Sequence, residues 1–386
     1  MIRKCINLLS FLLALMVVGC GGGVDVAGNG VGSGGTGSYT SGPVSGLGSI
    51  IVNGVRYDVD RANVKDESGA TLSRSELKLG MFVDVEGSLL TSGVDNDTAE
   101  ATTVRVASDF VGPFTDYVPG VSFKVWGRLI RLNSKTVLAV DLASHIGAVT
   151  VYGFIGPDGY TATRVESAIG TSFYKISGKV LSWNANTKKF SLGLKTYALS
   201  PSAAVPEGMG VDAWVRVRVS TVYVGFIESL LDEIPVSALT VIAPPARDAQ
   251  VARLRGVVAG ALVGRRFILN GVVVDLGSLS TSGLAANVRV MVRGRLSAGV
   301  LNATSIEVED DDTDQDREVE LHGYPEGAIS ATQLTVRGVP IEYSLAVVDA
   351  GTPTLSNLTC IEVRGRTYNS SRRLVATRIK ADNDCR

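Results

Sequence analysis

The chemistry open to this chain is limited by its two histidines, His145 and His322. His322 is the middle residue of a Leu-His-Gly triplet, and similar triplets elsewhere carry Trp, Ser, Arg or Leu in its place. A position that accepts such different side chains is predicted to be an ordinary strand position without a catalytic role. His145 lies in a predicted loop without a neighbouring acid to orient its ring. No nucleophile elbow, zinc-ligand spacing, phosphate loop or dinucleotide fingerprint occurs, so the sequence favours a protein that is not an enzyme.

An acidic run late in the chain is the one candidate metal site. Four of its acids have the alternating oxygen spacing with which loops wrap calcium: Asp312, Asp314, Asp316 and Glu318. The sixth position from Asp312 is Arg317, where the EF-hand pattern requires glycine. The other interpretation is a solvated linker whose like charges repel one another. We favour the linker, with calcium as the only cofactor to be tested.

Two tryptophans are candidates for a ligand platform. Trp126 and Trp214 lie out of phase with the valines of their predicted strands, so their rings are expected to face outward. An outward ring binds a glycan or peptide in some proteins and packs against a neighbouring domain in others. Packing is the more common use, and both interpretations stay open.

The first residues form a targeting segment that is excluded from the fold. Arg3 and Lys4 precede a short apolar run, which is too short for a comfortable membrane span of about 20 residues. Val-Val-Gly-Cys, ending at Cys20, resembles the lipobox of bacterial lipoproteins. The resemblance implies cleavage before Cys20, thioether lipidation of its sulfur and acylation of the new N-terminus. The alternatives are an ordinary signal peptide or a membrane span that contains a cysteine.

The residues after Cys20 indicate where in the cell the protein is located. By resemblance to enterobacterial sorting, Gly21 implies the outer membrane, and the Gly- and Ser-rich stretch that follows is predicted to be a flexible tether. We therefore expect a cell outer membrane lipoprotein that faces the periplasm, held in the bilayer by acylated Cys20. An envelope protein or a polysaccharide is the expected further partner. Loss of Arg3 and Lys4 takes the net charge from −1 to −3, which gives no electrostatic footprint for nucleic acid.

Two cysteines remain after Cys5 leaves with the signal and Cys20 takes the lipid. In an oxidising periplasm Cys360 and Cys385 are predicted to form a disulfide that holds the C-terminal tail. The alternative is a free Cys385, one residue from the end of the chain.

The remaining sequence is built from repeats of short strands. Abundant Gly and Val without helical periodicity predict an all-β chain. Asn53-Gly54, Asn270-Gly271 and Arg337-Gly338 separate alternating apolar runs and predict hairpin turns. The opening signature, an apolar residue, any residue and Gly, is placed at Gly46–Gly48, Val125–Gly127, Ile176–Gly178, Leu254–Gly256 and Leu321–Gly323. A second recurrent glycine is predicted to mark a bend or bulge after the middle strand, at Gly87, Gly153, Gly294 and Gly365.

These signatures divide the chain into about five small β-barrel modules. The predicted order is signal peptide 1–19, lipid-anchored tether 20–43, module 1 at 44–109, module 2 at 110–170, module 3 at 171–233, proline-containing linker 234–249, module 4 at 250–309, acidic linker 310–317 and module 5 at 318–386. Closure of each barrel would remove its unpaired strand edges. Module 3 lacks the second glycine, and its closing strand is expected near Ile227–Glu228.

The repeat resembles a known bacterial family. Gly48 to Val55, Leu77 to Met81, Val83 to Gly87 and an Ala-Thr closing strand are similar to the domain of unknown function 5666. The resemblance implies tandem repeats in secreted or lipid-anchored proteins, a small OB-like barrel and no established activity.

The expected function is therefore structural. The leading hypothesis is a non-enzymatic, lipid-anchored spacer or protein-interaction scaffold in the cell envelope. The alternative is a binding protein whose grooves between modules hold a glycan, a peptide or calcium. A third hypothesis is an enzyme whose carboxylates are brought together across modules.

Overall fold

The computed structural model describes residues 37–93, 96–156, 159–221, 233–242, 247–309, 318–383 and 385. These residues form β-strands and loops, with one short 3-10 turn at Arg74–Glu76, so the all-β prediction is confirmed. Among the described residues, no helix has the length and apolar character needed to cross a membrane. Cys20, Asp312, Asp314 and Asp316 lie outside the described residues.

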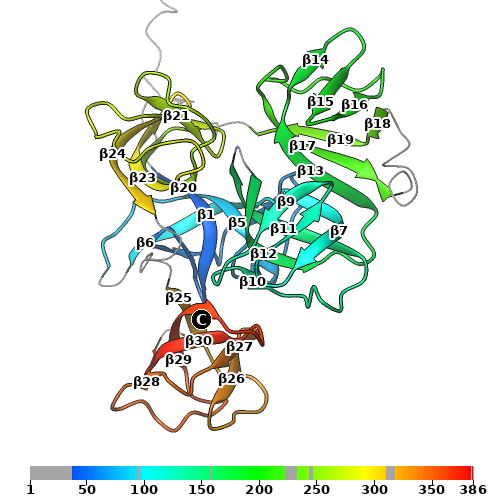
Figure 1. Cartoon of the computed structure of the whole chain (residues 1–386). Coiled ribbons are helices and arrows are strands. Elements are labelled where there is room, and N and C mark those ends of the chain that lie inside the picture. Colours follow the sequence, from blue (N-terminus) through cyan, green and yellow to red (C-terminus); the bar gives the residue numbers. More distant parts are fainter. Residues whose placement is uncertain are drawn as a thin grey trace, which may run out of the picture. The chain divides into compact units, whose positions relative to one another are not determined.

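We group the strands into five consecutive segments, coloured from blue to red along the chain in Figure 1. Segment 1 contains β1 (Ser38–Leu47), β2 (Ile50–Val52), β3 (Val55–Asp58), β4 (Asn63–Asp66), β5 (Phe82–Gly87) and β6 (Asp97–Val106). Segment 2 contains β7 (Phe110–Val118), β8 (Ser122–Val125), β9 (Arg128–Arg131), β10 (Val137–Leu138), β11 (Ala148–Gly156) and β12 (Gly159–Ser167). Segment 3 contains β13 (Phe173–Lys179), β14 (Ser182–Asn184), β15 (Lys189–Leu192), β16 (Lys195–Leu199), β17 (Trp214–Ser220), β18 (Glu233–Val236) and β19 (Ala238–Val241).

The last two segments complete the described chain. Segment 4 contains β20 (Ala249–Val257), β21 (Arg266–Leu269), β22 (Val272–Asp275), β23 (Arg289–Ser297) and β24 (Val300–Glu309). Segment 5 contains β25 (Val319–Gly323), β26 (Gln333–Val336), β27 (Val339–Glu342), β28 (Val347–Val348), β29 (Ile361–Tyr368) and β30 (Leu374–Ala381).

One pairing scheme recurs in these segments and produces small barrel-like sheets. The first strand pairs antiparallel with a later middle strand, as in β1–β5, β7–β11, β13–β17, β20–β23 and β25–β29. The middle strand pairs antiparallel with the next, as in β5–β6, β11–β12, β23–β24 and β29–β30. The second strand of an intervening hairpin runs parallel to the last strand, as in β3–β6, β9–β12, β22–β24 and β27–β30.

The hairpin turns form as the sequence predicts. Asn53 and Gly54 have φ angles of 51° and 70°, and Asn270 and Gly271 have φ angles of 52° and 81°. Positive φ at both central residues matches the twist of the flanking strands, which explains the Asn-Gly choice. Arg337 and Gly338 adopt the same conformation, so all three predicted turns are confirmed.

The second recurrent glycine marks a bulge, as predicted. The register shifts at Gly87, Gly153, Gly294 and Gly365, where the middle strand pairs with the last strand. A Cβ on Gly153 would lie 2.1 Å from a backbone carbonyl oxygen, and one on Gly87 or Gly365 would lie 2.6 Å from one. Only glycine permits this close backbone approach. The β17–β19 pair, which takes the corresponding place in segment 3, has a regular register, in agreement with its missing glycine.

Two of the five predicted positions of the opening-strand glycine were wrong. Val125–Gly127 forms the β8–β9 turn, where Trp126 has a φ of 54°, and Gly46–Gly48 lies at the end of β1. The equivalent opening-strand glycines are Gly42 and Gly112. The error arose because an apolar residue, any residue and Gly is also the pattern of a strand that enters a tight turn.

In segments 1, 2, 4 and 5 the opening-strand glycine makes room for the first residue of the hairpin turn. A Cβ on Gly42 would lie 2.5 Å from Asn53, and a Cβ on Gly256 would lie 2.4 Å from Asn270. The turn side chain also donates a hydrogen bond to the carbonyl oxygen of the residue before the glycine. The donors and acceptors are Asn53 to Ser41 (2.8 Å), Trp126 to Val111 (3.2 Å), Asn270 to Arg255 (2.9 Å) and Arg337 to His322 (2.7 Å). This contact fixes each hairpin against its opening strand.

The opening strands also join the segments. β1 runs parallel to β20 over Ser38–Ser41 and parallel to β25 at Gly46 and Leu47. One apolar cluster contains the cores of segments 1 and 5, and a second contains those of segments 2 and 3. These pairings cover strand edges that would otherwise be exposed.

The stretch expected as a proline-containing linker instead completes segment 3. β18 pairs parallel with β16, with Pro235 opposite Ala198, and β19 pairs antiparallel with β17. Pro235 is exposed on an edge strand, a place where proline is tolerated because no ladder hydrogen bond is lost. The closing strand expected at Ile227–Glu228 falls outside the described residues.

Candidate functional site

The main hollow of interest is a cavity of about 470 Å³ over the outer face of the segment 1 sheet. We call this surface face 1. It consists of Tyr39 and Ser41 on β1, Phe82, Asp84 and Glu86 on β5, and Thr103 and Arg105 on β6. Its side chains alternate with Val83 and Val85, which are fully buried in the segment core. Period-two alternation along β5 therefore places the polar residues in the cavity.

The register brings acids and donors side by side on face 1. Asp84 lies between Ser41 on β1 and Arg105 on β6, and Glu86 lies between Tyr39 and Thr103. Tyr39 donates a hydrogen bond from its hydroxyl to Asp84 Oδ1 at 3.0 Å. Burial, followed by the negative charge of Asp84, raises the pKa of the Tyr39 hydroxyl well above its ordinary value. Tyr39 is therefore neutral and a hydrogen-bond donor at physiological pH.

Segment 3 supplies a wall of the cavity. Trp214 and Arg216 occupy alternate positions of β17 and are half-buried. Ile155, Val257 and Ile268 from segments 2 and 4 add an apolar rim. The cavity thus combines aromatic side chains, aliphatic side chains and a polar floor, which is the usual composition of a small-molecule site.

Some of the lining charges are neutralised within the protein. Asp109 accepts hydrogen bonds from Tyr160 (2.9 Å) and Ser177 (3.0 Å) and forms an ion pair with Arg216 at 3.0 Å. Glu67 contacts both Lys175 and Arg218. Burial acts to raise the pKa of Glu67, but the Lys175 ammonium outweighs it and holds that pKa below its ordinary value. These acids join segments and are not free to bind a ligand.

Three charged groups of face 1 are not neutralised by an ion pair in the part of the chain that the structure describes. Within the part of the chain that the structure describes, Asp84, Glu86 and Arg105 form no ion pair. Asp84 and Arg105 are cross-strand neighbours, yet they do not come within ion-pair distance of each other. These groups are the polar contacts that the cavity offers to a ligand.

The two candidate platform residues have different surroundings. Trp126 packs edge-on against Tyr174 of segment 3 at 6.0 Å, and its indole nitrogen donates to the Val111 carbonyl. Trp126 is thus occupied in joining segments 2 and 3. Trp214 lines the cavity, with its neighbour Arg216 turned toward Asp109. Only Trp214 is placed to contact a ligand in this cavity.

A second polar cluster, called face 5, lies on the outer face of the segment 5 sheet. It consists of Glu320 and His322 on β25, Glu362 and Arg364 on β29, and Lys380 on β30. His322 is 2% exposed and lies 2.6 Å from Glu320 Oε1 through Nε2 and 2.7 Å from Asp382 Oδ2 through Nδ1. Arg56 of segment 1 reaches both Glu320 and His322. The ordinary strand position expected for His322 is therefore a buried, charged one.

The surroundings of face 5 favour the charged forms of His322 and Glu320. Burial acts to lower the pKa of His322, but its hydrogen bonds to Glu320 and Asp382 outweigh this effect and raise that pKa. Burial acts to raise the pKa of Glu320, but the hydrogen bond from His322 and the charge of Arg56 lower it to about 2. An imidazolium donates from both nitrogens, which satisfies both carboxylates.

Face 5 has the spacing of a metal site but the charges of an ion-pair network. Ligand atoms of Glu320, His322 and Glu362 lie within 4.8 Å of one another. Glu362 is already bound by Arg364 at 2.6 Å and by Lys380 at 2.9 Å, and Glu320 is bound by Arg56. Because these cations neutralise the carboxylates, the residues do not fit a divalent cation.

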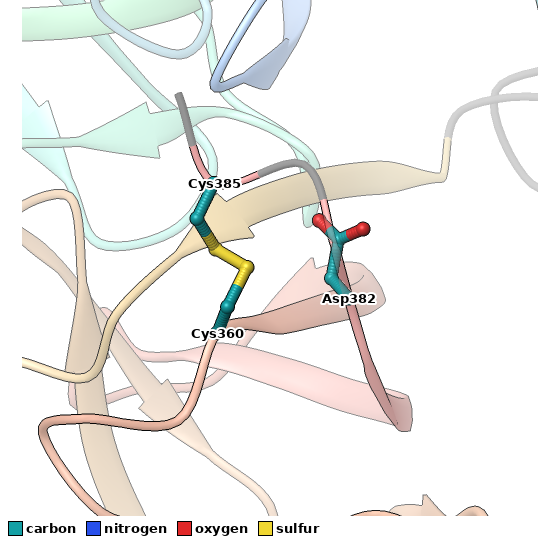
Figure 2. A group of neighbouring side chains, drawn as sticks. All are labelled: Cys360, Asp382 and Cys385. Atoms are coloured by element: carbon teal, nitrogen blue, oxygen red, sulfur yellow. A yellow bond between two sulfur atoms is a disulfide. The ribbon is translucent and has the colours of Figure 1, made fainter.

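The predicted disulfide between Cys360 and Cys385 is present, with a Cα–Cα separation of 5.8 Å. Figure 2 shows Asp382 beside the bonded cysteines. Asp382 also donates its backbone N–H to the Cys360 carbonyl at 3.0 Å, and its carboxylate contacts His322. The disulfide therefore fixes the tail whose Asp382 carboxylate contacts His322 of face 5.

Sequence reasoning missed face 5 and face 1, and of the cavity lining it named only Trp214. The alternation of Glu320 and His322 around Leu321 was the available signal, since two polar residues on one face of a strand share an environment. Of the four calcium candidates, Glu318 alone is described, and it lies 3.7 Å from Arg364 and 3.9 Å from Arg366. Glu318 is thus engaged by cations of segment 5.

Comparison with known families finds the same family in two regions of the chain. Residues 41–94 and residues 326–380 each match the family described as Domain of unknown function (DUF5666). The two matches fall in segments 1 and 5, whose strands share one pairing scheme. No curated protein matches the chain. The chain is therefore a repeat-bearing protein that resembles the domain of unknown function 5666 in two separate regions.

Proposed function

We propose that the chain is a tandem array of five OB-like modules, held in the outer membrane by acylated Cys20, that serves as a non-enzymatic spacer or protein-interaction scaffold facing the periplasm. The observation that carries this proposal is the docking of segments through their opening strands. A chain of freely jointed domains would keep these edges unpaired. Docked domains instead hold binding surfaces at fixed separations, which is what a scaffold requires.

Buried ion pairs between segments support a rigid array. Lys175 of segment 3 is 2% exposed and contacts Glu67 of segment 1, while its ammonium donates to Ser108 Oγ at 2.7 Å. Removing one partner of such a buried pair typically costs about 3–5 kcal/mol, because the other charge stays buried without compensation. Segments 1 and 3 therefore resist separation.

Further contacts tie segment 1 to its neighbours. Arg164 of segment 2 donates to the Leu79 carbonyl at 3.1 Å, and Thr163 donates to the Gly80 carbonyl at 2.6 Å. Arg253 of segment 4 contacts Asp97 and donates to the Asn53 carbonyl at 3.2 Å. Segment 1 is thus the common docking partner of segments 2, 3, 4 and 5.

The anchor is tested by fractionation of cells. Cys20→Ala removes the sulfur that carries the lipid, so the variant is expected to leave the membrane fraction. A Cys20→Ala chain that stays with the outer membrane would show that acylation is not the anchor.

The scaffold is tested by crosslinking in intact cells and purification through a C-terminal tag. We expect one recurrent, near-stoichiometric protein partner for the native chain. Lys175→Met should reduce its recovery, because it weakens the docking of segment 1 on segment 3. Lys124→Met is the matched control, since Lys124 pairs with Asp116 at an exposed site within segment 2. The proposal fails if no protein is recovered, or if both variants recover it equally.

A further inference from the structure

We infer that the cavity over face 1 binds a short, uncharged oligosaccharide. The cavity of about 470 Å³ lies within the size range of small-molecule pockets, about 300–1,000 Å³. This inference rests on the proposed docking, because segments 1 to 4 all contribute to the lining. It assigns a ligand site to that arrangement.

Trp214 supplies the first requirement of a sugar site. Its indole is half-buried at the cavity wall, beside the aliphatic side chain of Val241. A flat aromatic face packs against the C–H groups of a pyranose ring and leaves the sugar hydroxyls free to reach polar groups. Trp126 and Trp183 pack against Tyr174 and Phe190, so they are occupied by protein side chains.

Face 1 supplies the second requirement, which is a mixture of donors and acceptors. Asp84 and Glu86 accept hydrogen bonds, Arg105 donates, and the Thr103 hydroxyl does both. All four lie on neighbouring positions of β5 and β6 and line the cavity. Sugar hydroxyls are both donors and acceptors, so they satisfy this mixed set better than a group of one kind.

The charges of the lining argue for a neutral ligand. Glu67 and Asp109 are neutralised by Lys175, Arg218 and Arg216, as described above. The remaining charged groups are two carboxylates, Asp84 and Glu86, and one guanidinium, Arg105. These three groups carry a net charge of −1, so they repel an anion. Their opposite charges lie on one floor, and the hydroxyl groups of an uncharged saccharide can donate to the carboxylates and accept from Arg105 at the same time.

The test uses the mature chain in detergent and three saccharides: the β-1,4 tetramer of N-acetylglucosamine, cellotetraose and maltotetraose. Isothermal titration calorimetry is expected to detect binding of at least one of them. Trp214→Ala should weaken that binding by at least tenfold, because it removes the stacking surface. Thr103→Val should weaken it by about threefold without removing the aromatic wall. Trp183→Phe, which alters an indole outside the cavity, is the matched control and should bind as the native chain does.

Each contrary outcome is decisive. The inference is overturned if none of the three saccharides binds, or if Trp214→Ala and Thr103→Val both bind as tightly as the native chain. It is also overturned if a tetralysine peptide binds in the cavity and the saccharides do not compete with it. Thermal unfolding of the same samples separates this failure from that of the scaffold. A single cooperative transition without saccharide binding refutes only the sugar site, whereas separate transitions refute docking.

Discussion

Face 1 and face 5 are built on the same sheet positions and have opposite characters. Alignment of their bulge glycines, Gly87 and Gly365, makes the remaining positions equivalent. The equivalent pairs are Tyr39 and Glu320, Ser41 and His322, Asp84 and Glu362, Glu86 and Arg364, and Arg105 and Lys380. In both segments an acid on the middle strand lies opposite a cation on the last strand.

The difference lies in what these acids contact. Glu362 is 4% exposed and pairs with Lys380 at 2.9 Å, whereas Asp84 is half-buried and forms no ion pair with Arg105. Arg56 closes face 5, while face 1 opens into the cavity. The same backbone arrangement thus forms a closed structural face in segment 5 and an open candidate site in segment 1. The side chains at the equivalent positions account for the difference. Function in this fold has to be sought position by position.

The largest expected effect on stability comes from the bulge glycines that the two sheets share. Gly87→Ala and Gly365→Ala should each destabilise the protein by about 3 kcal/mol, because each new Cβ would lie 2.6 Å from a backbone carbonyl oxygen. Gly260→Ala, where a Cβ meets nothing within 4 Å, should change the free energy of unfolding by less than about 0.5 kcal/mol. Chemical denaturation measures all three. A harmless Gly365→Ala beside a damaging Gly87→Ala would show that the two sheets are not equivalent.

The next largest effect concerns one pair of equivalent positions at which segments 1 and 5 carry different residues. Phe82 of segment 1 packs edge-on against Phe154 at 5.6 Å, and its equivalent in segment 5 is Cys360, which is bonded to Cys385. Replacing both cysteines with Ser should lower stability by about 2–4 kcal/mol, since the disulfide closes a loop with a separation of 25 residues. Segment 5 should lose protection from hydrogen exchange, and face 1 should keep it. Equal loss in both segments would contradict a local effect of the disulfide on segment 5.

The turns and bulges of the sheets are well predicted from the sequence because they depend on the conformations of a few neighbouring residues. The Asn53-Gly54 turn follows from the need for positive φ, and the bulge at Gly87 follows from close backbone approach. Trp126 was placed in the wrong element because a turn and an opening strand share one short pattern. Pro235 was read as a linker because its exposed edge position depends on which strand lies beside it.

The sites were harder to predict because they depend on contacts between segments. Nothing local to His322 shows that Arg56, 266 residues away, will reach it. Likewise, Trp214 becomes a cavity wall only because segment 3 docks against segment 1. The pairing of Cys360 with Cys385 was predictable because the expected loss of Cys5 with a signal peptide and the expected lipidation of Cys20 would leave only these two cysteines.

A charge-neutralising pair of substitutions tests whether the acids of the two faces differ as described. Glu362→Gln should destabilise the protein by about 1–3 kcal/mol, because Arg364 and Lys380 lose a buried partner. Asp84→Asn at the equivalent position should change stability by less than about 0.5 kcal/mol, since Asp84 forms no ion pair and Asn can still accept from Tyr39. Thermal and urea unfolding would both report the contrast. Similar losses for the two variants would mean that Asp84 is also a structural residue.

The smallest effect is the pH dependence that His322 gives to face 5 and that Ser41 cannot give to face 1. The folded pKa of His322 is raised, so its contribution to stability is complete below about pH 6.5, its ordinary pKa, and is lost as the pH rises through the folded value. Glu320 acts in the opposite direction: its contribution is present above its ordinary pKa of 4.5 and is lost as the pH falls toward about 2. Between pH 6 and pH 9 the free energy of unfolding should therefore fall in the native chain and fall less in His322→Asn. Parallel curves for the two proteins would show that the imidazolium bound by Glu320 and Asp382 does not stabilise face 5.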